Sequence, residues 1–93
     1  MYIGKVVGNV VSTKKEDSLT GFKLMIVNLI RIPSEAVYQE IVAVDVVGAG
    51  RGEYVLVTKG SSARNIGNSS QSLIDAAIVG IIDTFDGCID MES

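Results

Sequence analysis

The chain has 93 residues, 47% of them hydrophobic, and a mean hydropathy of +0.38. Its net charge of −3 provides no cationic field that would attract nucleic-acid phosphates. Histidine, the commonest general base and metal ligand, is absent. Cys88 stands alone, which excludes an intrachain disulfide framework and favours a reducing compartment such as the cytoplasm. This length predicts one domain, residues 1–93, with a modest core.

So short a chain leaves part of its apolar surface to be covered by something other than its own core. No apolar run approaches the roughly 18 to 20 residues of a membrane-spanning helix. The opening residues, Met1 to Lys5, lack the basic-then-apolar layout of a signal peptide. We therefore expect no membrane association. The apolar surface is expected to be covered by protein, most simply by identical subunits around a symmetry axis.

The first predicted strand is Tyr2–Thr13, which is rich in Val and Ile and interrupted by Gly4 and Gly8. Strict alternation would place Val6 and Val10 on one face, and Ile3, Val7 and Val11 on the other. Apolar residues on both faces are typical of a strand that is covered on both sides. Glycines inside such a strand indicate coiling or a close approach between backbones.

The remaining chain predicts four more short strands, separated by polar and glycine-rich turns. These strands are residues 22–32, 40–47, 54–59 and 78–83. Pro33 ends the second, because proline cannot donate a backbone hydrogen bond to a neighbouring strand. No stretch has helical periodicity, although a single helical turn near residues 61–65 or 75–77 is an open alternative. The pattern predicts an all-β barrel or sandwich.

Two features of the segment 45–53 could carry chemistry. Glycine-rich loops such as Gly48–Gly52 can bind phosphate, but that design needs a following helix, and here Glu53 and a predicted strand follow. We therefore predict a tight turn at a crowded position. Asp45 lies among valines and has no histidine partner for catalysis. We expect its carboxylate to pair with an arginine or with turn N–H groups, within the chain or on a neighbouring subunit.

The sequence supports the other candidate functional sites even less than those of segment 45–53. Ser61 and Ser62 lack the Ser-x-x-Lys spacing of a lysine-activated nucleophile. Asp83, Asp86 and Asp90 are too widely spaced for a calcium loop. Aromatic residues make up 5% of the chain and do not alternate with basic ones, which disfavours a barrel that stacks nucleic-acid bases. We expect no enzyme activity, no metal and no cofactor.

Several stretches, taken together, resemble one family. They are residues 6–8, 13–15, 19–24, 44–55 (Val-Asp-Val-Val-Gly-Ala-Gly-Arg-Gly-Glu-Tyr-Val), 60–64 (Gly-Ser-Ser-Ala-Arg) and 75–83. In this order they resemble the pentameric vertex proteins of bacterial microcompartment shells, which occur in carboxysomes and in ethanolamine- and propanediol-type compartments. The resemblance spans nearly the whole chain. It departs from the family pattern in the loops 33–40 and 65–74 and in the acidic tail.

The resemblance implies a five-stranded oligonucleotide-binding-like β-barrel and a homopentamer with a narrow central channel. It also implies a structural role at the five-fold vertices of a shell in the cytoplasm, in contact with hexameric shell proteins. The alternative function is a small nucleic-acid-binding β-barrel. We expect the assembly contacts to involve charged and small residues of the matching stretches. These are Asp45, Gly48, Ala49, Gly50, Gly52, Glu53 and Arg64.

Overall fold

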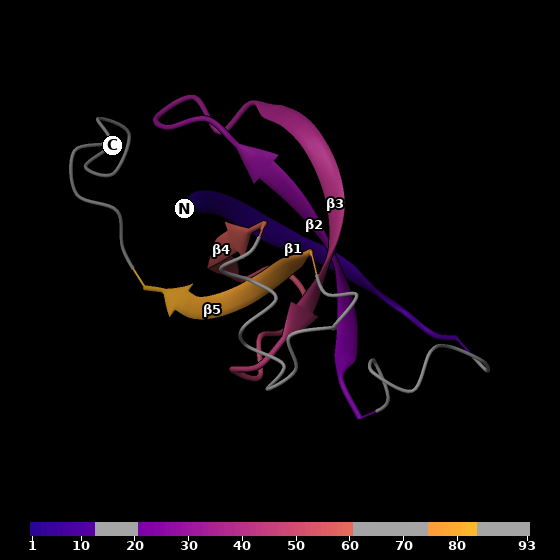
Figure 1. Ribbon diagram of the computed structural model, residues 1–93. Helices are drawn as coiled ribbons and strands as arrows, with labels where there is room; N and C mark the ends of the chain where they lie inside the picture. The colour runs from indigo at the N-terminus through magenta and orange to yellow at the C-terminus, as the bar shows by residue number, and fades with distance from the viewer. Residues whose placement is uncertain (13–20, 61–74, 84–93) are drawn as a thin grey trace.

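The computed structural model describes residues 1–12, 21–60 and 75–83, which contain five strands and no helix (Figure 1). The strands are β1 (Tyr2–Val10), β2 (Lys23–Ile30), β3 (Val37–Asp45), β4 (Tyr54–Lys59) and β5 (Ala76–Ile82). The prediction of an all-β fold is therefore confirmed.

The strands form a closed barrel in the order β1-β2-β3-β5-β4. Four of the neighbouring pairs are antiparallel. The fifth pair, β3 with β5, is parallel and joins Val44 to Ala77 and Asp45 to Ile78. Closure leaves no long open edge, which is how small five-stranded barrels of the oligonucleotide-binding type protect their backbone groups. The predicted five-stranded barrel is thus confirmed.

Four of the five strands differ in their bounds from the prediction. β1 ends at Val10 and not at Thr13, and β2 is shorter than residues 22–32. β3 begins earlier and ends earlier than residues 40–47. β5 begins at Ala76, so the alternative of a helical turn near residues 75–77 is wrong. Ala76 and Ala77 pair with Lys59 and Thr58 of β4, and this ladder outweighs the weak strand preference of alanine.

The core fills the barrel interior with small and branched side chains. Its buried members are Val6, Met25, Val27, Leu29, Ala43, Ala49, Val55, Val57, Ala76 and Ile78. Gly4 faces this interior, and a Cβ atom there would overlap the Cγ1 atom of Val27. The expectation of a close approach at a glycine of the first strand is therefore confirmed, and β1 and β2 lie closer together at Gly4 than a side chain would allow.

The outer surface of the barrel carries a second apolar layer. Side chains alternate along each strand, so the neighbours of the interior positions Met25 and Ala43 face outward. Val44 and Ala77 are buried on this outer side and pack with Phe22, Leu24 and Val79. Two-sided apolar strands, as predicted from the sequence, are therefore present in β2 and β3.

Candidate functional site

The turn after β3 is organised by the carboxylate of Asp45. Its Oδ1 atom accepts hydrogen bonds from the backbone N–H groups of Val47 and Gly48, each 3.0 Å long. Aspartate commonly stabilises turns by binding the backbone two or three residues further on. The side chain is only 8% exposed, and its Oδ2 atom is buried without a hydrogen-bond partner. The expected hydrogen bond from Asp45 to turn backbone is confirmed.

The glycines of this turn differ in their backbone conformation. Gly48 has φ +82° and Gly52 has φ +89°, values that an L side chain rarely adopts. Gly50 has no positive φ, and a Cβ atom there would meet the Glu53 Oε1 atom at an ordinary 3.6 Å. Positive φ therefore accounts for glycine at positions 48 and 52, but not at position 50.

Glu53 closes the turn and β1 holds it in place. The N–H of Gly50 donates to Glu53 Oε1 over 2.6 Å, and the N–H of Glu53 donates to the Gly50 carbonyl over 3.1 Å. On the β1 side, the N–H of Gly52 donates to the Val6 carbonyl over 2.7 Å, and the N–H of Val6 donates to the Glu53 carbonyl over 3.0 Å. Ala49 is buried and belongs to the core. These hydrogen bonds and the burial of Ala49 therefore fix the turn to the barrel.

These bonds limit what the turn can do chemically. The N–H groups of Val47, Gly48, Gly50, Gly52 and Glu53 are all engaged within the chain, and β4 follows where a phosphate loop would need a helix. The exposed residues of the turn are both apolar and charged: Val46 and Val47 are 41% and 39% exposed, and Arg51 and Glu53 are exposed as well. The engaged N–H groups disfavour an anion site, and the exposed valines favour contact with protein.

Several predicted candidates lie outside the described residues: Arg64, Ser61, Ser62, Asp86 and Asp90. A contact of Arg64 with Asp45 or with another subunit therefore stays a prediction. Asp83 follows β5 and is exposed. In the described parts of the chain, no three Cys, Asp or Glu side chains gather in a way that could hold a metal ion. Those parts also contain no helix long and apolar enough to cross a membrane.

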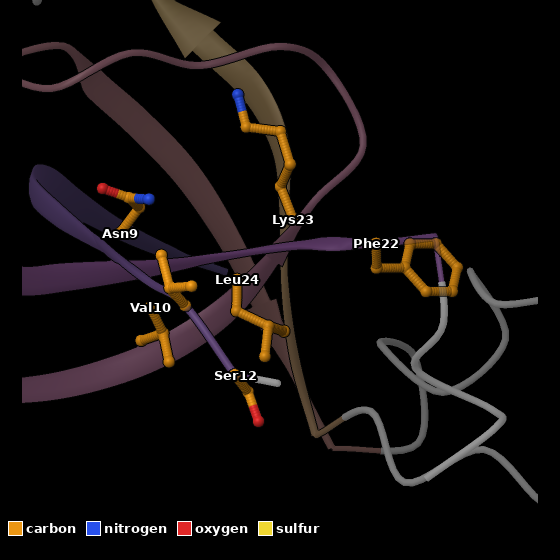
Figure 2. A pocket seen from close by; sticks show the side chains of 7 residues that line it. Asn9, Val10, Ser12, Phe22, Lys23 and Leu24 are labelled. Atoms are coloured by element: carbon orange, nitrogen blue, oxygen red, sulfur yellow. The ribbon is translucent and has the colours of Figure 1, made fainter. Parts of the chain in front are cut away.

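Sequence reasoning missed a hollow of about 220 Å³ on the outer surface, where β1 ends and β2 begins. It is lined by Asn9, Val10, Val11, Ser12, Phe22, Lys23 and Leu24 (Figure 2). Val10 and Leu24 are direct partners in the β1–β2 ladder and are among the apolar residues that line the hollow. The signal in the sequence was the presence of apolar residues on both faces of these strands.

A second missed feature joins the β2–β3 connection to β4. The hydroxyl of Tyr54 donates to Glu35 Oε1 over 2.5 Å, and the Lys5 Nζ atom lies 5.4 Å from the centre of the Tyr54 ring. At the other end of β4, the Lys59 Nζ atom lies 5.0 Å from the centre of the Tyr2 ring. Nothing in the sequence indicated these contacts, because they depend on strand pairing across the barrel.

Comparison with known proteins connects this geometry to a family. The family model described as ethanolamine utilisation protein EutN/carboxysome matches residues 1–83. The chain belongs to the EutN/CcmL family. The match includes all five strands and the turn 45–53.

Individual relatives cover almost the full length of the chain. The microcompartment shell vertex protein GrpN of Rhodospirillum rubrum is 52% identical over 87 residues, which are 90% of this chain and 94% of GrpN. The carboxysome shell vertex protein CcmL of Thermosynechococcus vestitus is 49% identical over 84 residues, covering 90% of this chain and 85% of CcmL.

A solved structure of a EutN/CcmL relative extends the likeness to three dimensions. It is the GrpN pentameric microcompartment shell protein from Rhodospirillum rubrum, which superposes with a TM-score of 0.82 at 50% identity. The aligned part covers 92% of this chain and 98% of that one. Such coverage leaves no major element of GrpN without a counterpart.

Proposed function

We propose that this protein is a structural subunit of a bacterial microcompartment shell, and that it forms homopentamers that occupy the five-fold vertices. The observation that carries the proposal is the likeness to GrpN over nearly the whole of both chains, since GrpN is described as a pentameric shell protein. Family membership over residues 1–83 supports the same function. The protein would then reside in the shell, within the cytoplasm.

The surface of the barrel agrees with assembly. Large apolar side chains are exposed in the single chain, including Val42 on β3 and Val46 and Val47 on the turn. A lone barrel in water gains nothing from exposing them, whereas burial between subunits removes their apolar surface from water. Residues 45–53 present Val46 and Val47 on a backbone held by hydrogen bonds, which supports the proposal that the turn belongs to an assembly contact.

The role at a vertex follows from geometry. A sheet of hexagonal tiles can extend flat without limit, and five-fold positions supply the curvature that closes it into a polyhedron. We propose that the pentamer meets hexameric shell proteins at these positions. Each contact can be weak, because a ring engages several neighbours at once and the contacts act together.

The proposal assigns no catalytic activity, cofactor or metal to the protein. The alternative of a nucleic-acid-binding barrel finds no support, because the relatives are named as shell proteins and the net charge is −3.

Native mass spectrometry tests the oligomeric state directly. The dominant species should have five times the chain mass of 9.8 kDa, and a dominant monomer at micromolar concentration would contradict the proposal. Co-expression with hexameric shell proteins tests the vertex role. Closed particles should form with this chain, and tubes, sheets or uncapped bodies should dominate without it. Equal numbers of sealed particles in both cases would rule out the vertex role.

A further inference from the structure

The connection between β2 and β3, residues 31–36, is exposed at every position and forms the loop at the top of Figure 1. We call it the β2–β3 tip. One rung of the ladder, Ile30 opposite Val37, lies between the tip and an irregularity in the register, where Tyr38 is an extra residue on the β3 side. Such a bulge interrupts the ladder and bends its strand. The tip is therefore joined to the barrel at a bending point.

Hydrogen bonds within the tip give it a shape of its own. The N–H of Arg31 donates to the Ala36 carbonyl over 3.0 Å, and the N–H of Glu35 donates to the Arg31 carbonyl over 2.7 Å. The N–H of Ala36 donates to Ser34 Oγ over 3.2 Å. Beside the bulge, the Arg31 Cζ atom lies 4.5 Å from the centre of the Tyr38 ring, within the range of a cation–π contact. These contacts favour movement of the tip as one unit about the bulge.

Glu35 has a backbone conformation that its residue type seldom adopts. Its φ is +61°, in the left-handed region that suits glycine and disfavours residues with a Cβ atom. Such a conformation persists where surrounding contacts compensate for it. The carboxylate makes a contact of this kind, because the Tyr54 hydroxyl donates to Glu35 Oε1 over 2.5 Å. The negative charge of the acceptor strengthens this hydrogen bond.

Tyr54 offers Glu35 a partner that is itself held in place. It lies at the start of β4, where it pairs with Lys5 of β1. The Lys5 Nζ atom lies 5.4 Å from the centre of the Tyr54 ring, so the ring is also held by a cation on the outer surface. β5 pairs with β3 at Val44 and Asp45, at the opposite end of that strand from the tip. The Glu35–Tyr54 bond thus joins the tip to a strand outside its own hairpin.

We infer that the β2–β3 tip is a hinged flap, which bends at Tyr38 and which the Glu35–Tyr54 hydrogen bond holds against β4. We call this bond the strap. With the strap closed, the exposed side chains of Ile32 in the tip and Val37 beside it keep one orientation relative to the barrel. With the strap open, the left-handed conformation of Glu35 loses its support and the tip leaves that orientation. The inference goes beyond the proposed function and does not depend on it, since every contact lies within one chain.

Quenched-flow hydrogen exchange, read by mass spectrometry on overlapping peptides, tests the strap. Tyr54→Phe removes the hydroxyl and keeps the ring, and Glu35→Ala removes the carboxylate. Each should raise the exchange rate of the tip amides at least about fivefold, because a hydrogen bond to a charged group is lost while the barrel stays folded. The double variant should exchange no faster than the faster single variant, since both changes break the same bond. The amides of Val6 and Gly52, which bond β1 to the turn after β3, should exchange as in the wild type.

Tyr38→Phe is the matched control for Tyr54→Phe. It removes a tyrosine hydroxyl at the base of the tip and keeps the ring on which Arg31 stacks. The structure shows no hydrogen bond from the Tyr38 hydroxyl to any described residue, so the tip of this variant should exchange like the wild type. Glu35→Gln keeps an acceptor oxygen without its charge, and its rate should lie between those of the wild type and Glu35→Ala. Circular dichroism and native mass spectrometry verify that all variants share the fold and oligomeric state of the wild type.

Four results would overturn the inference. The first is a Tyr54→Phe tip that exchanges like the wild type, and the second is a Tyr38→Phe tip that opens as much as that of Tyr54→Phe. A third is an equal rise at the Val6 and Gly52 amides, which would show a less stable barrel and no separate flap. The fourth is a double variant whose rise is the product of the two single rises. A wild-type chain that is not pentameric contradicts the proposed function alone.

Discussion

The turn after β3 and the outer surface of the barrel differ in how their needs are met. In the turn, the carboxylates of Asp45 and Glu53 bind backbone N–H groups, so its hydrogen bonds are largely completed within one chain. On the outer surface, Val42 is exposed and Leu56 is partly exposed. The comparison teaches that one chain suffices to fix the backbone of the barrel, whereas the removal of its outer apolar surface from water depends on assembly.

The largest expected loss of stability comes from a substitution in the barrel interior, because the turn and the outer surface both depend on the folded barrel. Leu29 is among the largest fully buried side chains, and Leu29→Ala leaves a cavity that should lower the free energy of unfolding by about 2–5 kcal/mol. That is a large part of the stability of a small domain, so the turn and the outer surface should be lost together on mild heating. Thermal unfolding followed by circular dichroism measures it. Val11→Ala, at a side chain that is 85% exposed, is the control and should melt like the wild type.

A smaller effect is expected at Asp45, where the turn would lose its side-chain acceptor. Asp45→Ala leaves the N–H groups of Val47 and Gly48 without their partner and should cost about 1–3 kcal/mol. Asp45→Asn keeps an oxygen that can accept both bonds and should cost less. Urea unfolding of the two variants at equal concentration measures the difference. Equal losses would show that Asp45 does not act through these two hydrogen bonds.

The smallest effect distinguishes two glycines within the turn. Gly48→Ala places a side chain at φ +82° and should cost about 1–2 kcal/mol. Gly50→Ala meets neither a positive φ nor a close neighbour, and should stay within about 0.5 kcal/mol of the wild type. Urea unfolding compares the two, and equal destabilisation would contradict the assignment of strain to Gly48 alone.

Gly50 also offers a sharper test of the turn as an assembly contact. The chain itself has room for a Cβ at this position, so a larger side chain should leave the barrel folded. Gly50→Val should therefore weaken the ring without unfolding the subunit, which native mass spectrometry together with circular dichroism can establish. Rings as stable as those of the wild type would place the turn outside the contact.

The strands could be predicted wherever local sequence decides them. Residues 54–59 were predicted with the observed bounds, because a glycine turn precedes a short β-rich run. The third strand was displaced because Val46 and Val47 resemble strand residues, whereas the Asp45 carboxylate captures the N–H of Val47 and turns the chain. That competition depends on a side-chain hydrogen bond that hydrophobic periodicity does not reveal.

The orientation of side chains was less predictable than the strands themselves. Alternation placed Val6 and Val10 on one face, but the ladder has a bulge between Val6 and Gly8. Val6 faces the interior opposite Val27, whereas Val10, beyond the bulge, lies opposite Leu24 on the outer surface. One inserted residue exchanges the faces of everything that follows it, and its position depends on closure of the barrel. The residues of the outer apolar surface could therefore not be identified from the sequence alone.

In the candidate site, the sequence predicted the tight turn and the hydrogen bonding of Asp45 to turn N–H groups. Gly50 could not be distinguished from its neighbours, because a run of glycines does not reveal which residue adopts positive φ. The contacts of Lys5 and Glu35 with Tyr54 were equally hidden, since they join segments that are distant in the sequence. Local chemistry was predictable, and contacts that depend on register were not.

The place of β5 in the barrel has a consequence for biosynthesis. β5 is the last strand of the described residues, and it pairs with both β3 and β4. While the ribosome is still producing the segment before Ala76, the barrel therefore stays open between those two strands. Two core positions, Ala76 and Ile78, are filled only when β5 arrives, so the interior is completed last during synthesis.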